Sequence, residues 1–320
     1  MKKSEISRRE LLAAGSAAGL GMVMGKAAGQ ETVPTKPDKV QVCVFSKHLQ
    51  WLDYDGMAQK AADAGFDGLD LTVRPGGHVE PENVERDLPR AVRAVQRAGL
   101  SVPMMTTSVN SVSSETRKVL GTAAELGIGY YRMGYFRYRN GGDLEDTLDL
   151  ASRELERFAQ LNESLGIRGG YQNHAGEGYF GASIWDLWYA LRNVDPNWVG
   201  SQFDLRHASV EGALNWSVDF RRIAPWVHTL AIKDYKVASE NDELLVSNCP
   251  LGQGVAPFRK FLSMLRGVKF MGPVSLHLEY PLGGADQGKR ELEIPESEVI
   301  AAMKADLTTL RSWLQRVGLA

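Results

Sequence analysis

Short apolar runs recur along the chain, and each run ends in polar or glycine-rich sequence followed by a helical pattern of apolar positions. The even spacing of these runs leaves room for one helix between each pair, as a repeated strand-helix unit requires. Eight runs are predicted as strands: residues 39–45, 68–73, 101–106, 129–133, 167–172, 199–204, 227–232 and 274–279.

The intervening helical patterns end at glycine. Patterns over residues 53–64, 90–98, 114–126 and 144–165 are followed by Gly65, Gly99, Gly127 and Gly166. Repeated helix-glycine-strand junctions, with no Asn-Gly hairpin signal between them, favour parallel strands. We therefore predict the α/β class and a single (β/α)8 TIM barrel over residues 37–320, since such barrels take about 250 residues. The alternative is a doubly wound sheet, but Phe45-Ser46-Lys47-His48 stands where its glycine-rich phosphate loop would follow the first strand.

The first 36 residues form a separate segment in this interpretation. Basic residues including Arg8 and Arg9 precede an uncharged, weakly apolar stretch from Leu11 to Gly25, which is the layout of a signal peptide. The arginine pair and the mild hydrophobicity are typical of the twin-arginine route, so we predict a signal peptide and linker over residues 1–36 and a periplasmic protein. The stretch is shorter than the ~20 residues that span a bilayer, so no stable membrane anchor is expected.

Charge excludes one class of partner. The chain has 37 Lys and Arg residues against 39 Asp and Glu residues, a formal net charge of -2. Strong nucleic-acid binding needs a basic excess, and this chain lacks one. The composition is otherwise that of an ordinary soluble enzyme with a small-molecule substrate.

Reactive side chains of a TIM barrel lie at the carboxyl ends of its strands, and polar residues concentrate at those ends here. Five of the six histidines fall at or just beyond predicted strand ends: His48, His78, His174, His207 and His277. Because residues two apart on a strand face the same way, we expect one rim to carry Gln172, His174, Asp204, His207, Lys233, His277 and Glu279. Imidazoles, an amine and carboxylates in one cavity suit proton transfer next to a carbonyl group.

Four of these segments carry a family resemblance. They are Tyr171-Gln172-Asn173-His174, Phe203-Asp204-Leu205-Arg206-His207-Ala208, Ile232-Lys233-Asp234-Tyr235 and Pro273-Val274-Ser275-Leu276-His277-Leu278-Glu279. In this order they resemble the Glu-Asn-His, Asp-x-x-His, His-x-Lys-Asp and Ser-x-Glu segments of the xylose isomerase-like barrel superfamily. That superfamily includes sugar-phosphate isomerases and enzymes like D-tagatose 3-epimerase. The loop from Pro250 to Gly254 is similar to its Gly-x-Gly loop after the seventh strand.

The resemblance implies a divalent metal, but the ligand positions differ. The family's Glu, Asp, His and Glu ligands correspond here to Gln172, Asp204, Ala231 and His277. Alanine cannot ligate a metal, and a neutral amide oxygen binds a hard cation more weakly than a carboxylate does. A rearranged site would use Asp204, His277 and Glu279, with Mn, Zn or Mg as the metal.

Substrate contacts are predicted at four positions. Arg74 directly follows the second predicted strand, and His78 follows a Pro-Gly-Gly turn after it. Lys47 follows the first strand, and Gln172 ends the fifth. A guanidinium, an ammonium and hydrogen-bonding groups at the rim would hold the hydroxyl or carboxylate groups of a sugar.

The leading hypothesis is a sugar isomerase or epimerase that removes a proton next to a carbonyl. Glu279 is the preferred base, with its pKa raised by burial; Lys233 and His207 stabilise the oxyanion, and His174 returns the proton. One alternative is a lyase that eliminates the β-substituent of a 3-keto sugar or glycoside. Another is a periplasmic carbohydrate-binding barrel without activity. The family's DNA-repair endonuclease branch is disfavoured by the net charge, and the sequence does not indicate the oligomeric state.

Overall fold

A closed barrel of eight parallel strands forms the centre of the molecule. The computed structural model describes residues 39–138, 142–241 and 243–320, so the predicted leader lies outside the described residues. Around the barrel the strands follow the order β1, β10, β7, β6, β5, β4, β3, β2. Their bounds are β1 Val42–Phe45, β2 Gly68–Val73, β3 Ser101–Thr107, β4 Tyr130–Arg132, β5 Arg168–Gln172, β6 Val199–Asp204, β7 Val227–Ile232 and β10 Val274–Leu276. The prediction of a (β/α)8 TIM barrel is confirmed.

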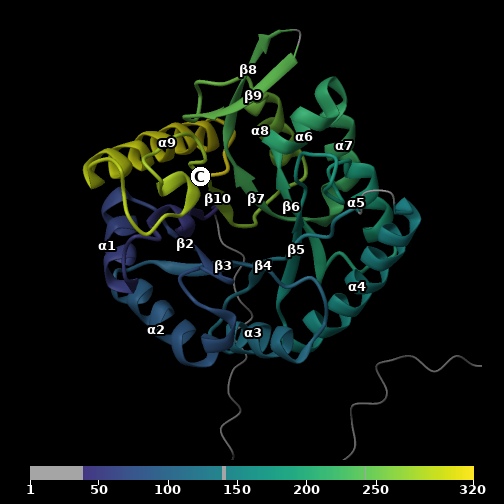
Figure 1. The fold of residues 1–320 in the computed structure, drawn as a ribbon, viewed down its shortest axis with the longest axis horizontal. Coiled ribbons are helices and arrows are strands. Elements are labelled where there is room, and N and C mark those ends of the chain that lie inside the picture. Colours follow the sequence, from purple (N-terminus) through teal and green to yellow (C-terminus); the bar gives the residue numbers. More distant parts are fainter. Residues whose placement is uncertain (1–38, 139–141, 242) are drawn as a thin grey trace, which may run out of the picture. The chain divides into compact units, whose positions relative to one another are not determined.

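Helices surround the barrel as an outer ring (Figure 1). Local sequence sets their ends: the Asp53 side chain accepts a hydrogen bond from Gly56 N at the start of α1, and Gly65 ends that helix with a left-handed φ of 94°. The bounds are α1 Tyr54–Ala64, α2 Val84–Arg97, α3 Ser114–Glu125, α4 Leu144–Leu165, α5 Ile184–Leu191, α6 Leu205–Gly212, α7 Trp216–Ile223, α8 Phe258–Gly267 and α9 Glu296–Arg316.

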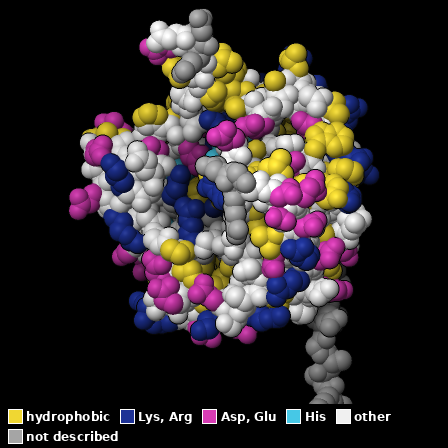
Figure 2. Space-filling model, turned by 45° about the vertical axis from the view of Figure 1, so that its right-hand side comes forward, with side chains coloured by type: hydrophobic (Ala, Val, Ile, Leu, Met, Phe, Trp, Pro, Cys, Tyr) yellow, Lys and Arg dark blue, Asp and Glu magenta, His cyan; other side chains and the backbone are white. Residues whose placement is uncertain are grey.

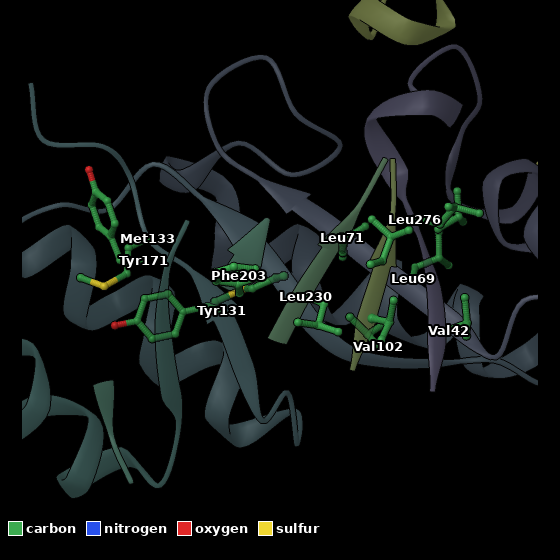
Figure 3. Packing of buried hydrophobic residues seen from close by; sticks show 14 of the residues in the cluster. Val42, Leu69, Leu71, Val102, Tyr131, Met133, Tyr171, Phe203, Leu230 and Leu276 are labelled. Carbon is green, nitrogen blue, oxygen red and sulfur yellow. The ribbon is translucent and has the colours of Figure 1, made fainter. Parts of the chain in front are cut away.

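The strands divide their side chains between two faces of the barrel wall. Apolar residues that alternate along the strands pack in one buried cluster; Figure 3 shows Leu69 and Leu71 of β2, Tyr131 of β4, and Phe203 of β6. Phe203 meets the helix side, since its ring stacks on Phe261 of α8 at 5.5 Å. The intervening positions point into the barrel and are largely polar. This alternation delivers the polar side chains to the interior.

Several element boundaries differ from the prediction, and two of the differences change how a segment is interpreted. Helix α2 begins at Val84 rather than at residue 90, because Pro89 lies inside the helix instead of opening it. Strand β10 ends at Leu276, so His277 and Glu279 lie just beyond the strand. The His277 amide still donates to Ile232 O across 2.9 Å, which keeps this segment beside β7.

An antiparallel hairpin departs from the purely parallel prediction. Strands β8 (Asp234–Glu240) and β9 (Glu243–Cys249) pair from Asp234 with Cys249 to Glu240 with Glu243, and they project beyond the barrel (Figure 1). The turn uses Asn241 at a left-handed φ of 50°, a conformation that Asn tolerates without an Asn-Gly pair. In the described residues, no helix combines the length and apolarity that crossing a bilayer requires.

Candidate active site

Asp204 lies at the centre of the polar cluster at the carboxyl ends of the strands. It ends β6 and caps α6, since its Oδ1 accepts from His207 N at 3.1 Å. The Asn173 side chain donates to Asp204 O at 3.0 Å and accepts from Asp204 N at 2.9 Å. The Asn173 side chain therefore holds both backbone polar groups of Asp204 and fixes the end of β6.

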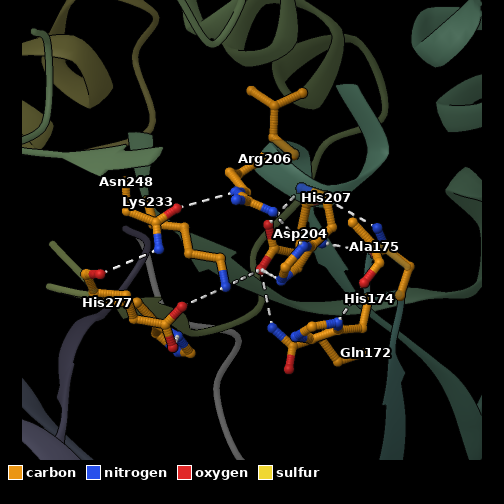
Figure 4. Close-up of polar contacts among 12 residues, drawn as sticks. Gln172, His174, Ala175, Asp204, Arg206, His207, Lys233, Asn248 and His277 are labelled. Atoms are coloured by element: carbon orange, nitrogen blue, oxygen red, sulfur yellow. Dashed lines mark hydrogen bonds and ion pairs between the residues drawn. The ribbon is translucent and has the colours of Figure 1, made fainter. Parts of the chain in front are cut away.

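Lys233 reaches toward the Asp204 carboxylate (Figure 4). Its Nζ lies 3.2 Å from Asp204 Oδ2 and 2.8 Å from Glu279 Oε2. A second ammonium, Nζ of Lys47, lies 3.2 Å from Glu279 Oε1. Two carboxylates and two ammonium groups thus form one chain of ion pairs, in which Asp204 and Lys233 are buried and Glu279 is partly exposed.

The ion pairs favour the charged forms of Glu279 and Lys233. Burial alone would raise the pKa of Glu279, but the Lys233 ammonium, and after it the Lys47 ammonium, hold it well below its usual value. Burial alone would lower the pKa of Lys233, but Asp204 and Glu279 raise it. The expected raised pKa of Glu279 is therefore wrong, because the favourable contacts with cations outweigh desolvation.

Gln172 presents its amide N–H to Asp204. Its Oε1 accepts from Arg132 Nη1 at 2.8 Å and from Tyr135 Oη at 2.6 Å. Since a guanidinium can only donate, the oxygen must face Arg132, and Nε2 then donates to Asp204 Oδ2 at 2.9 Å. Gln172 is thus a donor to the carboxylate and has no oxygen directed at it.

Hydrogen-bond partners also assign the tautomers of His174 and His207, whose rings lie 4.0 Å apart. His174 Nδ1 lies 2.9 Å from Ala175 O, an acceptor, so Nδ1 carries the proton and Nε2 the lone pair. His207 Nδ1 accepts from Arg206 Nη1 at 3.1 Å, so its Nε2 carries the proton. Burial lowers the pKa of both rings, so each is neutral near pH 7.

His277 belongs to a buried relay inside the barrel. Ser275 Oγ donates to Asp70 Oδ2 at 2.7 Å and lies 3.1 Å from His277 Nε2. Because the Ser275 proton is used for Asp70, Nε2 of His277 donates to Ser275 and Nδ1 carries the lone pair. Nδ1 lies 3.5 Å from Glu279 Oε1. A proton that binds to His277 Nδ1 would therefore lie between His277 and Glu279.

Most predicted rim residues come together. The cluster contains Gln172, His174, Asp204, His207, Lys233, His277, Glu279 and Lys47. Arg74 lies beside it, with its guanidinium 5.4 Å from the Phe45 ring, which itself stacks on His277. Figure 2 shows a hollow on one side of the molecule in which Lys and Arg side chains gather.

His78 belongs to a separate set of contacts. Its ring lies 3.2 Å from Thr72 Oγ1 and 3.2 Å from Leu49 O, and burial lowers its pKa to about 4. His48 is likewise bonded between Ala285 O and the amide of Leu278. Both rings hold loops at the strand ends together.

Sequence reasoning missed three contributors. Arg132 ends β4 and orients Gln172; Asn248 of β9 donates to Glu279 O at 3.1 Å; Ser275 orients His277. The position of Arg132 could have indicated its role, since Arg132 is the last residue of its strand, as Gln172 is of the next. Asn248 had no such signal because the hairpin that carries it was not predicted.

The residues present do not fit the divalent metal that the resemblance implies. Among the described residues, no group of three His, Cys, Asp or Glu side chains is arranged to hold a metal ion. The Gln172 oxygen is occupied by Arg132 and Tyr135, and Ala231 offers no donor atom. The oxygens of Asp204 and Glu279 that face each other share an ammonium instead.

Comparisons with known proteins agree with the fold. Residues 58–300 match the model of the family described as xylose isomerase-like TIM barrel. Solved structures of similar fold include a 3-keto-D-glucoside 4-epimerase from E. coli, with TM-score 0.61 and 14% identity, covering 86% of this chain and 100% of that one. A D-psicose 3-epimerase with D-tagatose from Clostridium cellulolyticum H10 has TM-score 0.63 and 14% identity, covering 86% and 99%.

A third similar structure is a xylose isomerase-like TIM barrel protein from Mycobacterium smegmatis in complex with magnesium. Its TM-score is 0.63 at 14% identity, covering 88% of this chain and 98% of that one. None of the curated proteins compared matches the chain in sequence.

Proposed function

The chain belongs to the xylose isomerase-like TIM barrel family, and from this premise we propose that it is a sugar isomerase or epimerase. The reaction removes a proton from a carbon atom next to a carbonyl group and returns it to form the product. The observation that carries this proposal is the neutral imidazole of His174, with its lone pair on Nε2, close to the Lys233 ammonium and the N–H of His207.

His174 is the base in this proposal. It is partly exposed, whereas His207 and His277 are buried. A substrate that enters the mouth of the barrel, the opening at the carboxyl ends of its strands, therefore reaches His174 first. Its ring is held between Tyr179 at 4.1 Å and His207 at 4.0 Å, which fixes the plane in which Nε2 accepts a proton. A neutral imidazole is an effective base near pH 7.

Lys233 and His207 stabilise the enolate oxygen. The ammonium of Lys233 is a full charge held in place by two carboxylates, and preorganised charge is most effective in a site from which water is excluded. Among the described residues, His207 Nε2 has no hydrogen-bond partner and lies 3.6 Å from Asp204 Oδ2, so its N–H is available to a substrate oxygen.

Glu279 acts here as the partner of the two ammonium groups. A carboxylate with a strongly lowered pKa is a poor base, so the role assigned to Glu279 from the sequence is taken by His174. Once the Lys233 ammonium turns to a substrate oxyanion, Glu279 and His277 provide a second proton site on the β10 side of the mouth. Epimerisation needs two such sites, because the proton leaves one face of the carbon and returns to the other.

The substrate class follows from the charge of the mouth and from the similar structures. Lys47, Arg74 and Arg132 add positive charge beside the cluster, which suits a substrate with electron-rich oxygens. Two of the similar structures are a 3-keto-D-glucoside 4-epimerase and a D-psicose 3-epimerase with D-tagatose. We therefore propose a ketose or an oxidised glycoside as substrate.

Hydrogen exchange tests the proposal directly. The protein is incubated in D2O with ketoses and 3-keto glycosides, and NMR follows the proton next to the carbonyl. We expect deuterium at that carbon and a product of otherwise unchanged mass. The His174→Gln variant should lose the exchange, and the Lys289→Ala variant, altered at an exposed ion pair with Glu293, should keep it.

Other outcomes identify the alternatives. Release of the β-substituent with formation of an enone would mean a lyase, since elimination starts from the same proton. Sugar binding in a calorimeter without exchange would mean a carbohydrate-binding barrel. Isomerisation without deuterium uptake would contradict the proton-abstraction mechanism.

A further inference from the structure

We propose that the Lys233 ammonium occupies the place of a divalent cation in this barrel, so that the mouth functions without a bound metal ion. The part of this inference in which Lys233 stabilises an oxyanion rests on the proposed function. The exclusion of a cation concerns Lys233, Asp204 and Glu279 alone and is measurable without a sugar.

The first support is the position of the ammonium. Lys233 Nζ lies 3.2 Å from Asp204 Oδ2 and 2.8 Å from Glu279 Oε2, between two carboxylates that come from different strands. Lys233 is 4% exposed, so bulk water does not compete strongly for these contacts. A divalent cation bound by the same two oxygens would collide with the ammonium.

The second support is the use of the remaining donor atoms. Gln172 turns its N–H to Asp204, because Arg132 and Tyr135 occupy its oxygen. His277 Nε2 is bonded to Ser275. A hard cation takes six or more oxygen ligands, or six in an octahedron for Mg²⁺, whereas Gln172 directs a hydrogen atom and no oxygen toward Asp204.

The third support is the balance of charge. The carboxylates of Asp204 and Glu279 are matched by the ammonium groups of Lys233 and Lys47, and the Arg132 guanidinium lies one residue away through Gln172. No surplus negative charge remains in this cluster to attract a dication. The Lys233 ammonium, which is part of the chain, would stabilise the enolate oxygen in place of a metal ion. The activity would then not depend on the supply of metal.

The test begins with the unaltered protein. Metal content is measured after dialysis, and Mn²⁺ is titrated while free Mn²⁺ is followed by electron paramagnetic resonance. We expect no stoichiometric metal, no Mn²⁺ binding at the mouth, and the same melting temperature in EDTA as in Mn²⁺. A stoichiometric divalent ion that is lost in the Asp204→Asn variant would overturn the proposal.

The Lys233→Ala variant provides the converse measurement. Removal of the ammonium leaves two facing carboxylates, so this variant should acquire Mn²⁺ binding, and Mn²⁺ at about 100 times its Kd should raise the melting temperature by about 5 °C, reversibly with EDTA. Lys289→Ala is the matched control and should show no such gain. If Lys233→Ala folds but binds no Mn²⁺, the ammonium does not stand at a cation position and the proposal is wrong.

A double variant and the metal content of the unaltered protein cover the case in which Lys233→Ala does not fold. Lys233→Ala with Glu279→Gln leaves one carboxylate, so this double variant should fold more readily and bind little Mn²⁺. If Lys233→Ala does not fold, the metal content of the unaltered protein still decides. Because no sugar is used, a failure to find exchange of a sugar proton would count against the proposed function and leave this result standing.

Discussion

Ser275 donates its hydroxyl proton to Asp70 Oδ2 across 2.7 Å, and this bond determines which nitrogen of His277 carries the ring proton. The two residues are 205 positions apart and meet inside the barrel, where both are buried. The Ser275 hydroxyl thus links Asp70 inside the barrel to His277 at the site.

The Ser275→Ala variant should be less stable by about 1–3 kcal/mol, because Asp70 loses a donor and His277 Nε2 loses its acceptor inside the barrel. Urea unfolding measures the loss. Ser152→Ala is the control: its hydroxyl returns to Leu148 O within α4, and the change should be within about 0.5 kcal/mol. Nitrogen NMR shifts of His277 that stay the same in Ser275→Ala would contradict the tautomer assignment.

The base is identified by comparing two variants on a substrate found by the exchange experiment. His174→Gln should lower kcat by ~10²–10⁴-fold, whereas Glu279→Gln should lower it less. Burial lowers the pKa of His174 below 6.5, so the acid limb of kcat/KM should lie below pH 6.5. Glu293→Gln is the exposed control. A full loss in Glu279→Gln with activity kept in His174→Gln would return the role of base to Glu279.

Stability should depend on pH through Asp306 of α9. Burial raises its pKa from 3.8 to about 6, although Leu251 N and Tyr280 Oη donate to it and oppose the shift; the nearby Asp234 raises it further. The folded protein therefore binds this proton more tightly than the unfolded chain, and the contribution of Asp306 to stability is lost as pH rises from about 4 to about 6.

The Asp306→Asn variant removes this dependence. Its amide still accepts from Leu251 N and can donate to Tyr280 Oη, so above pH 6 it should be more stable than the unaltered protein by about 2–3 kcal/mol, and near pH 4 the two should be equal. Urea midpoints between pH 4 and 8 give the difference, with the exposed Asp55→Asn as control. Parallel curves for both proteins would show that Asp306 is charged throughout.

Asp234, the first residue of β8, should be the residue on which the loop after β9 depends most. Its carboxylate accepts from the backbone N–H groups of Tyr235, Gly252, Gly254 and Ala256. Asp234→Asn turns an N–H toward two of these donors and should cost about 2–4 kcal/mol in urea unfolding. Asp55→Asn is again the control, and an equal stability for Asp234→Asn would mean that the loop rearranges freely.

Export by the twin-arginine route remains a prediction from residues 1–36. Replacing Arg8 and Arg9 with Lys should leave the precursor in the cytoplasm, because this route recognises the arginine pair. Fractionation and immunoblotting of the full chain measure the distribution. Replacement of Lys2 and Lys3 with Arg keeps the charge and is the control; equal export of the Arg8 and Arg9 variant would exclude the route.

Local patterns predicted the barrel well because strand alternation and helix-ending glycines are encoded within a few residues. Strand β6 and helix α4 have the predicted bounds, and parity correctly placed Asp204 inside the barrel. The sign of the Glu279 pKa shift depends on Lys47 and Lys233, which are distant in sequence, so desolvation alone gave the wrong direction. Tautomers likewise follow from contacts such as Ser275 with Asp70, which periodicity cannot reveal.

The hairpin begins directly after Lys233, and its first pair is Asp234 with Cys249. The chain therefore leaves and returns at the same place. Asn248, one residue before the return, links Arg206 to Glu279 O and belongs to the catalytic mouth. Beyond the pair of Tyr235 with Asn248, the hairpin carries none of the side chains assigned to the site, so a shorter or longer tip should leave those side chains in their positions.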